Sequence, residues 1–145
     1  MKAKPPIEEV VLYQIDLTNK MAKQHSQKEF DQLGLGITIE QWVILKVVSE
    51  KEGLSQRELA SQTYRDPASI TRSLKLLIEK DLLFKEPDAL NRKLFKLFLS
   101  KNGKSFIAKH MKMIQSLREQ STRGIAEKDL DHLHRILKKI QSNMS

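Results

Sequence analysis

Four polar side chains in residues 67–79 have the types and spacing needed to bind another molecule. Ser69 and Thr71 carry short hydroxyls, and Arg72 and Lys75 carry long cationic side chains. The apolar residues of the same segment recur at i, i+4, i+7 and i+8: Ile70, Leu74, Leu77 and Ile78. On a helix this spacing turns the apolar residues inward and leaves the hydroxyls and cations outside, where they can hydrogen-bond polar edges and anions.

The elements that must position these side chains can be read from the neighbouring residues. Asp66 and Pro67 have the types preferred at a helix cap and first turn, and Ser55 with Glu58 indicates the start of a short helix before them. After the second helix, β-prone residues 82–84 and 94–99 flank the charged turn KEPDALNRK. Helix, turn, helix and hairpin in this order predict a winged helix-turn-helix.

In that arrangement the second helix lies in the DNA major groove, and the hairpin, or wing, reaches the neighbouring minor groove or phosphates. The predicted contacts of the recognition helix are Pro67, Ala68, Ser69, Thr71, Arg72 and Lys75. The predicted contacts of the wing are Asn91, Arg92 and Lys93, and the predicted phosphate contacts near helix starts are Thr38, Gln56 and Arg57. The same polar residues could also form an ordinary solvated face.

Longer helices are predicted on both sides of this segment. On the N-terminal side, residues 5–33 form one helix. Another helix is capped by Thr38 with Gln41 and ends near Gly53. Residues from Ser100 form a further helix, and a break at 122–124 precedes a last one. The prediction is mainly α with a small β wing, as one folding unit. Residues 1–36 and 101–145 form its helical dimerisation region, and residues 37–100 form its winged helix-turn-helix DNA-binding region.

Apolar stripes on the terminal helices predict a homodimer, because a small winged-helix core leaves them little to cover. The stripe residues are Val10, Val11, Met21, Leu117, Leu133, Ile136 and Ile140. Packing of these helices within one subunit is the alternative.

Composition narrows the class of protein. The 145 residues carry a formal net charge of +8, and residues 55–104 hold 11 Lys/Arg against 6 Asp/Glu, which favours a polyanionic partner. The absence of cysteine excludes disulfides and thiolate chemistry. No apolar run approaches a membrane span and the first residues lack a secretory signal, so a cytoplasmic protein without a membrane partner is expected. No enzyme motif, cofactor loop or metal-ligand spacing is found among the histidines or elsewhere.

Several segments together resemble the MarR family of bacterial transcription regulators. They are residues 37–42 (ITIEQW), 54–60 (LSQRELA), 69–72 (SITR), 76–80 (LLIEK) and 99–103 (LSKNG). The resemblance implies a six-helix fold and an intertwined homodimer that acts as a repressor or activator on a pseudo-palindromic operator. It also implies that a small-molecule effector can release the DNA. A winged-helix module that binds a protein in place of DNA is the alternative function.

The wing departs from the family's pattern. Relatives usually carry Asp-Arg-Arg or Asp-X-Arg, and this chain reads Asn91-Arg92-Lys93. Asn91 can still accept a hydrogen bond but not a charge-assisted one, so a looser wing and a weaker contribution from Arg92 are expected. An effector pocket is predicted where the first helix and Trp42 meet the helix that begins after Ser55 and the base of the wing, lined by Tyr13, Phe30 and Trp42. Core packing of these aromatic residues is the alternative.

Overall fold

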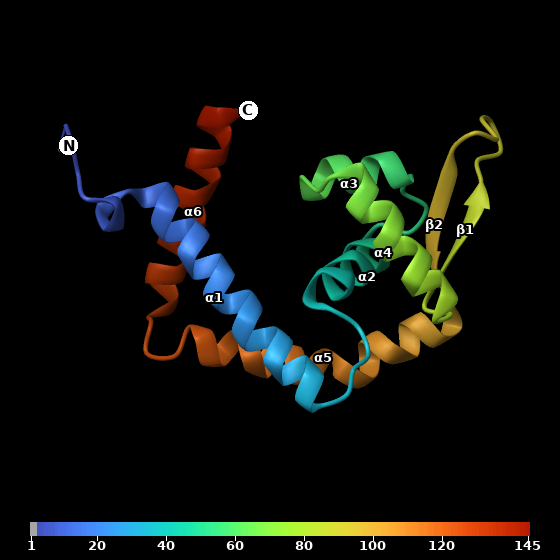
Figure 1. Ribbon diagram of the computed structural model, residues 1–145, viewed down its shortest axis with the longest axis horizontal. Coiled ribbons are helices and arrows are strands. Elements are labelled where there is room, and N and C mark those ends of the chain that lie inside the picture. Colours follow the sequence, from blue (N-terminus) through green and yellow to red (C-terminus); the bar gives the residue numbers. More distant parts are fainter. Residues whose placement is uncertain (1–2) are drawn as a thin grey trace. The chain divides into compact units, whose positions relative to one another are not determined.

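The computed structural model describes residues 3–145, and Figure 1 shows the order of its elements. Within these residues it has six α-helices, one 3-10 turn and two strands. This confirms the predicted fold class, mainly α with a small β wing. The chain divides into two compact units, one running up to Lys112 and the other Met113–Ser145. Residues 1 and 2, which begin the predicted dimerisation region, lie outside the described residues.

The first helix begins later than predicted. The 3-10 turn η1 spans Ile7–Glu9, Val10 is extended with ψ 119°, and α1 spans Val11–Gln32. Val10 and Val11 are both β-branched and have low helix propensity, which accounts for the break at a point where the sequence predicted a continuous helix. The Gln14 amide donates to the Glu8 carbonyl oxygen at 2.7 Å and fastens the turn to α1.

The next three helices begin at the predicted caps. Helix α2 (Ile39–Glu50) starts with the full Thr38–Gln41 capping box and ends at Glu50, three residues before the predicted end at Gly53. Helices α3 (Gln56–Thr63) and α4 (Pro67–Glu79) are capped by the Ser55 and Asp66 side chains, which accept from backbone N–H groups three residues on. These caps satisfy donors that a helix leaves unpaired at its start.

The wing is an antiparallel hairpin of β1 (Leu83–Pro87) and β2 (Phe95–Leu99), with Leu83 opposite Leu99 and Pro87 opposite Phe95. Strand β1 therefore ends three residues after the predicted segment 82–84. Its last residues are exposed and lack a β-prone pattern in the sequence, although their backbone pairs with β2. Gly53 and Leu54 also bond the backbone of Leu97 on the other edge of β2, at 2.8 and 2.9 Å. The residues before α3 thus extend the sheet, which the sequence did not predict.

The core of the first unit holds α4 by its apolar face. Ile70 and Leu77 are fully buried, and Leu74 is 3% exposed. They pack with a set of buried residues contributed by α2, α3 and the wing: Trp42, Ile44, Leu45, Val48, Leu59, Leu83 and Leu97. Figure 1 shows α2, α3, α4 and the wing gathered together in this unit.

The start of α5 (Lys101–Ser121) is joined closely to the residues after α4. Ser100 caps α5 by accepting from the Gly103 N–H at 2.9 Å and donates to the Asp81 carbonyl oxygen at 2.6 Å. A Cβ at Gly103 would collide with the Leu82 carbonyl oxygen. The second unit contains the rest of α5 and α6 (Glu127–Met144). Among the described residues, no helix is both long and apolar enough to cross a membrane.

The substitution Gly103→Ala is expected to destabilise the protein by more than about 3 kcal/mol, because the added methyl group collides with rigid backbone. Helix propensity alone predicts the opposite sign, a gain of up to about 1 kcal/mol for Ala over Gly. Urea unfolding followed by circular dichroism measures the change. Lys101→Ala, at an exposed position of the same helix, is the control and should stay within about 0.5 kcal/mol. Equal stability of Gly103→Ala and wild type would contradict the close approach.

Candidate functional site

The outer face of α4 has the side chains that the sequence predicted there. Pro67, Ala68, Thr71, Arg72 and Lys75 are exposed, and Ser69 is half-buried. The Asp66 carboxylate accepts from the Ser69 N–H at 3.1 Å, and the Ser69 hydroxyl oxygen accepts from the Arg72 guanidinium at 3.3 Å. The cap of the helix is thus linked through Ser69 to its first cation, so the N-terminal turn presents an ordered polar surface.

Helix α3 is linked to the same surface by a side-chain hydrogen bond. The Gln56 amide nitrogen donates to the Thr71 hydroxyl oxygen at 2.9 Å, and Thr71 donates to the Pro67 carbonyl oxygen at 2.9 Å. Gln56 was predicted as a phosphate contact. In the structure its side-chain amide is directed at α4 and holds Thr71.

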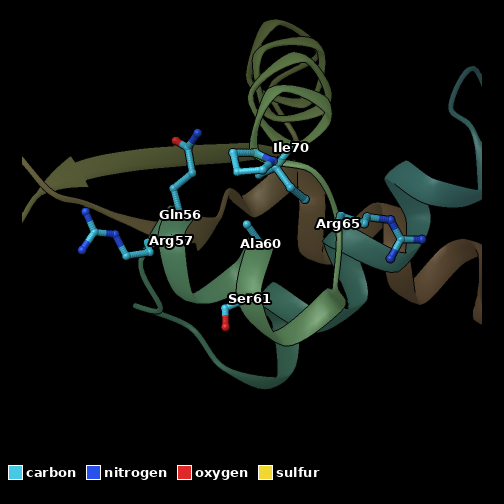
Figure 2. Close-up of a pocket in the computed structure, with 7 residues that line it drawn as sticks. Gln56, Arg57, Ala60, Ser61, Arg65 and Ile70 are labelled. Carbon is cyan, nitrogen blue, oxygen red and sulfur yellow. The ribbon is translucent and has the colours of Figure 1, made fainter. Parts of the chain in front are cut away.

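A hollow of about 490 Å³ lies between α3 and the start of α4 (Figure 2). Ala60, Pro67 and Ile70 give it an apolar lining, and polar side chains surround this lining: Gln56, Arg57, Ser61 and Arg65. In Figure 2 the guanidiniums of Arg57 and Arg65 point away from the hollow in opposite directions. The hollow brings together two predicted phosphate contacts, Gln56 and Arg57, with Pro67 of the predicted recognition helix.

The wing tip is organised by Asp88, which the sequence did not single out. Its carboxylate accepts from the N–H groups of Leu90 at 2.8 Å and Asn91 at 3.3 Å, and Lys96 Nζ lies 3.8 Å from its second oxygen. Asn91 accepts from the Lys93 N–H at 3.1 Å. Asn91, Arg92 and Lys93 are all exposed. The tip therefore has an anchoring carboxylate at position 88, although position 91 lacks one.

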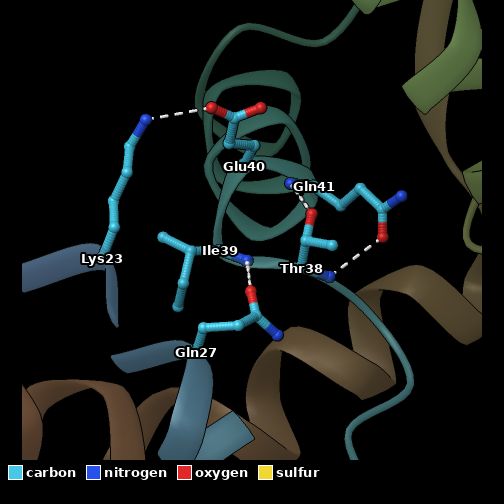
Figure 3. Close-up of polar contacts among 6 residues, drawn as sticks. All are labelled: Lys23, Gln27, Thr38, Ile39, Glu40 and Gln41. Atoms are coloured by element: carbon cyan, nitrogen blue, oxygen red, sulfur yellow. Dashed lines mark hydrogen bonds and ion pairs between the residues drawn. The ribbon is translucent and has the colours of Figure 1, made fainter. Parts of the chain in front are cut away.

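The start of α2 is tied to α1 by two contacts (Figure 3). Lys23 Nζ lies 3.0 Å from a Glu40 carboxylate oxygen, and the Ile39 N–H donates to Gln27 Oε1 at 3.0 Å. The hydrogen bond from Lys23 holds the pKa of Glu40 below its ordinary value, against the opposing effect of burial, and Arg65 adds a smaller coulombic effect. Thr38, a predicted phosphate contact, is exposed beside these contacts, and its hydroxyl oxygen caps α2.

The residues of the predicted effector pocket have different environments. Phe30 and Trp42 are buried at 1% and 3% exposure, whereas Tyr13 is 36% exposed. None of the three lines the hollow between α3 and α4. Trp42 lies 6.4 Å from the Phe106 ring, and among residues 3–145 its buried indole nitrogen has no hydrogen-bond partner.

Arg65 and Asp88 are the clearest additions to the predicted site. Asp88 could have been found from the Asp-Ala-Leu-Asn sequence, since aspartate often bonds the backbone two residues on. Arg65 gave no such signal, because only the folded turn between α3 and α4 brings it to the hollow. In the described part of the chain, no group of three or more metal-ligating side chains comes together.

Comparison with known proteins adds the following. Residues 35–93, from the loop before α2 to the wing tip, match the family model described as MarR family. The structure of the transcriptional regulator SlyA matches with TM-score 0.81 and 24% identity over 92% of this chain and 93% of that chain. A mutant MarR from E. coli complexed with operator DNA matches with TM-score 0.81 and 19% identity, covering 94% of this chain and 99% of that chain.

A MepR–DNA complex from S. aureus matches with TM-score 0.80 and 19% identity over 92% of this chain and 98% of that chain. At these identities the likeness establishes the fold alone. A comparison with curated protein sequences found no match.

The pKa of Asp88 is held below its ordinary value, first by the Leu90 N–H and then by Asn91 and Lys96. The Asp88 carboxylate therefore stabilises the wing tip fully at pH values above the ordinary aspartate pKa. This stabilisation is lost as the pH falls through the lowered pKa of Asp88. The amide NMR signals of Leu90 and Asn91 should titrate with a midpoint below the ordinary aspartate value. Asp88→Asn should abolish this titration. A midpoint at or above the ordinary value would rule out Asp88 as the anchor of the tip.

Proposed function

Because this chain is a MarR-like winged helix-turn-helix protein whose residues 35–93 match the MarR family, we propose that it is a DNA-binding transcription regulator. The observation that carries the proposal is the outer face of α4. Its start is fixed by the Asp66 cap, its apolar face is buried, and the Thr71 hydroxyl and the cations are exposed toward the major groove. Ser69, Thr71, Arg72 and Lys75 read bases or bind phosphates from this face, and Pro67 and Ala68 pack against the groove.

The wing and the helix starts supply the remaining DNA contacts. Arg92 and Lys93 reach the minor groove or its phosphates from the tip that Asp88 anchors, and Asn91 keeps the tip's backbone in place. Thr38 and Arg57 contact phosphates beside the recognition helix. These contacts position the protein, whereas the polar face of α4 supplies the sequence preference.

The protein acts as a homodimer in this proposal. Val11 and Met21 of α1 are 59% and 62% exposed, and Leu133 and Ile136 of α6 are 49% and 43% exposed. Side chains of this size leave water when a second copy covers them. A two-fold axis would then present two recognition helices to a pseudo-palindromic operator.

Further properties belong to the same proposal. The protein is a cytoplasmic, bacterial, non-enzymatic repressor or activator that needs no cofactor, and a small effector at Tyr13, Phe30 and Trp42 weakens its binding to DNA. The alternative, a module whose outer α4 face binds a protein, calls for large apolar side chains on that face. Leu76, at 44% exposure, is the large apolar side chain exposed on α4. A largely polar face therefore favours DNA over a protein partner.

The test is binding to DNA from upstream of the protein's own gene, beside an unrelated duplex of equal length, at two salt concentrations. We expect preferential binding that weakens steeply with salt, since phosphate contacts release counterions. Arg72→Ala should reduce operator affinity by at least about fivefold and lower the preference over the unrelated duplex. Arg118→Ala, an exposed arginine outside the site, is the control for charge. Absence of binding to any duplex at low salt would favour the alternative, in which the outer face of α4 binds a protein.

The homodimer has a separate test by analytical ultracentrifugation. The wild type should sediment as a dimer at micromolar concentration. Ile136→Glu places a charge on the apolar stripe of α6 and should raise the dimer dissociation constant by at least about tenfold. Lys138→Glu also adds an acidic group to α6, on another face of the helix, and should leave the dimer intact. A monomeric wild type at this concentration would remove the dimer from the proposal.

A further inference from the structure

Thr71 stands in the middle of a chain of hydrogen bonds that crosses from α3 to α4. Gln56 Nε2 donates to the Thr71 oxygen at 2.9 Å, and the Thr71 hydroxyl donates to the Pro67 carbonyl oxygen at 2.9 Å. Thr71 is nevertheless exposed on the face proposed to enter the major groove. Its side chain therefore belongs both to the contact between the two helices and to the proposed reading surface.

The hydrogen atoms of this chain can be assigned by counting donors. A threonine hydroxyl has one hydrogen and two lone pairs, and a backbone carbonyl can only accept. The Thr71 hydrogen must therefore point to the Pro67 oxygen. The group that Gln56 turns to Thr71 must then be its amide NH2, because a glutamine oxygen would face a hydroxyl oxygen with no hydrogen between them. One lone pair of Thr71 remains for a partner in the groove.

The remaining lone pair limits what Thr71 can recognise. In the major groove adenine and cytosine present an exocyclic amine, which donates, whereas guanine and thymine present carbonyl oxygens, which accept. A Thr71 that can only accept bonds the amine of adenine or cytosine. Against guanine or thymine it places two acceptors face to face.

We propose that Gln56 is a positioning residue that makes Thr71 an acceptor in the groove. The base facing Thr71 in each half-site is then adenine or cytosine in preference to guanine or thymine. This inference rests on the proposed function. The inference adds to the proposed function a chemical rule for one operator position, and a reason why a residue of α3 influences base preference. The Pro67 carbonyl oxygen accepts the Thr71 hydrogen, and Gln56 strengthens this bond because a hydroxyl that accepts one hydrogen bond donates a stronger one. Without Gln56 the hydrogen is held less firmly on Pro67 and turns more readily toward a base carbonyl.

Ser69, two residues before Thr71 on the same helix, is a useful contrast. Its oxygen accepts from the Arg72 guanidinium at 3.3 Å, and its own hydroxyl hydrogen is not used in any described contact. Ser69 can therefore donate as well as accept, so the rule applies to Thr71 alone on this face.

The experiment starts from an operator selected by the wild-type dimer from a pool of random duplexes. Each half-site position is then changed to all four base pairs, and affinities are measured for the wild type and for variants. The wild type should prefer adenine or cytosine at one strand position by about five- to tenfold, the effect of one hydrogen bond. Thr71→Val keeps the shape but cannot accept, so it should flatten this preference by losing affinity for the adenine and cytosine duplexes.

Gln56→Ala should flatten the same preference in a different way. It should bind the guanine and thymine duplexes more tightly, because the Thr71 hydrogen is held less firmly on Pro67 and can be donated to a base, and bind the other two as the wild type does. Loss of a phosphate contact by Gln56 would instead weaken binding to all four duplexes about equally, because phosphate contacts carry no sequence information. This gain on one pair of bases separates positioning of Thr71 from a merely structural role of Gln56.

Two matched variants control for effects on folding. Thr63→Val removes the same kind of hydroxyl from α3, where it donates to the Leu59 carbonyl oxygen at 2.7 Å. Gln62→Ala removes another α3 glutamine, whose oxygen accepts from Lys51 Nζ at 3.2 Å. Both should keep the wild-type base preference and a melting temperature close to that of the Thr71 and Gln56 variants.

Three results would overturn the inference while leaving the proposed function intact. They are a Thr71→Val protein that keeps every base preference, a wild type that prefers guanine or thymine at the Thr71 position, and a Gln56→Ala protein with the wild-type profile. A wild type that selects no sequence from the pool would overturn the proposed function itself, and the inference with it.

Discussion

Burial of one face of α4 is the interaction on which the arrangement of the site depends. Ile70, Leu74 and Leu77 are between 0% and 3% exposed, and burying each side chain contributes about 1.5–3 kcal/mol. The Asp66 cap contributes about 1 kcal/mol. Burial therefore holds the helix on the core, and the smaller capping energy decides at which residue it begins. The rotation that buries these three side chains also turns the polar residues outward.

The parts of the fold that depend on neighbouring residues could be predicted from the sequence. The caps at Thr38 and Asp66 were found because each bonds a residue three positions along the chain, a distance that the sequence displays directly. The inward face of α4 was found because its spacing matches the helical period. The late start of α1 was missed, since the apolar spacing continues through Val10 and does not reveal its extended backbone.

The parts that depend on separate elements meeting in space could not be predicted in the same way. Gln56 was assigned to phosphate because a helix start favours anions, and only the packing of α3 on α4 reveals its bond to Thr71. The added pairing of residues 53–55 with β2 likewise joins segments about forty positions apart. The expected loosening of the wing considered Asn91 alone. Asp88, outside the family's motif, supplies the carboxylate of this turn.

The close approach of Gly103 to the Leu82 carbonyl has a consequence for how such a protein can evolve. The contact is between backbones, so no exchange of side chains can adjust it, and any side chain at position 103 disrupts it. The atoms nearest to a Cβ at position 103 all belong to Leu82, so substitutions on the outer face of α4 leave this backbone contact unchanged. If α4 reads DNA as proposed, new base preferences can therefore arise by single substitutions on α4, while the position of the helix is inherited unchanged.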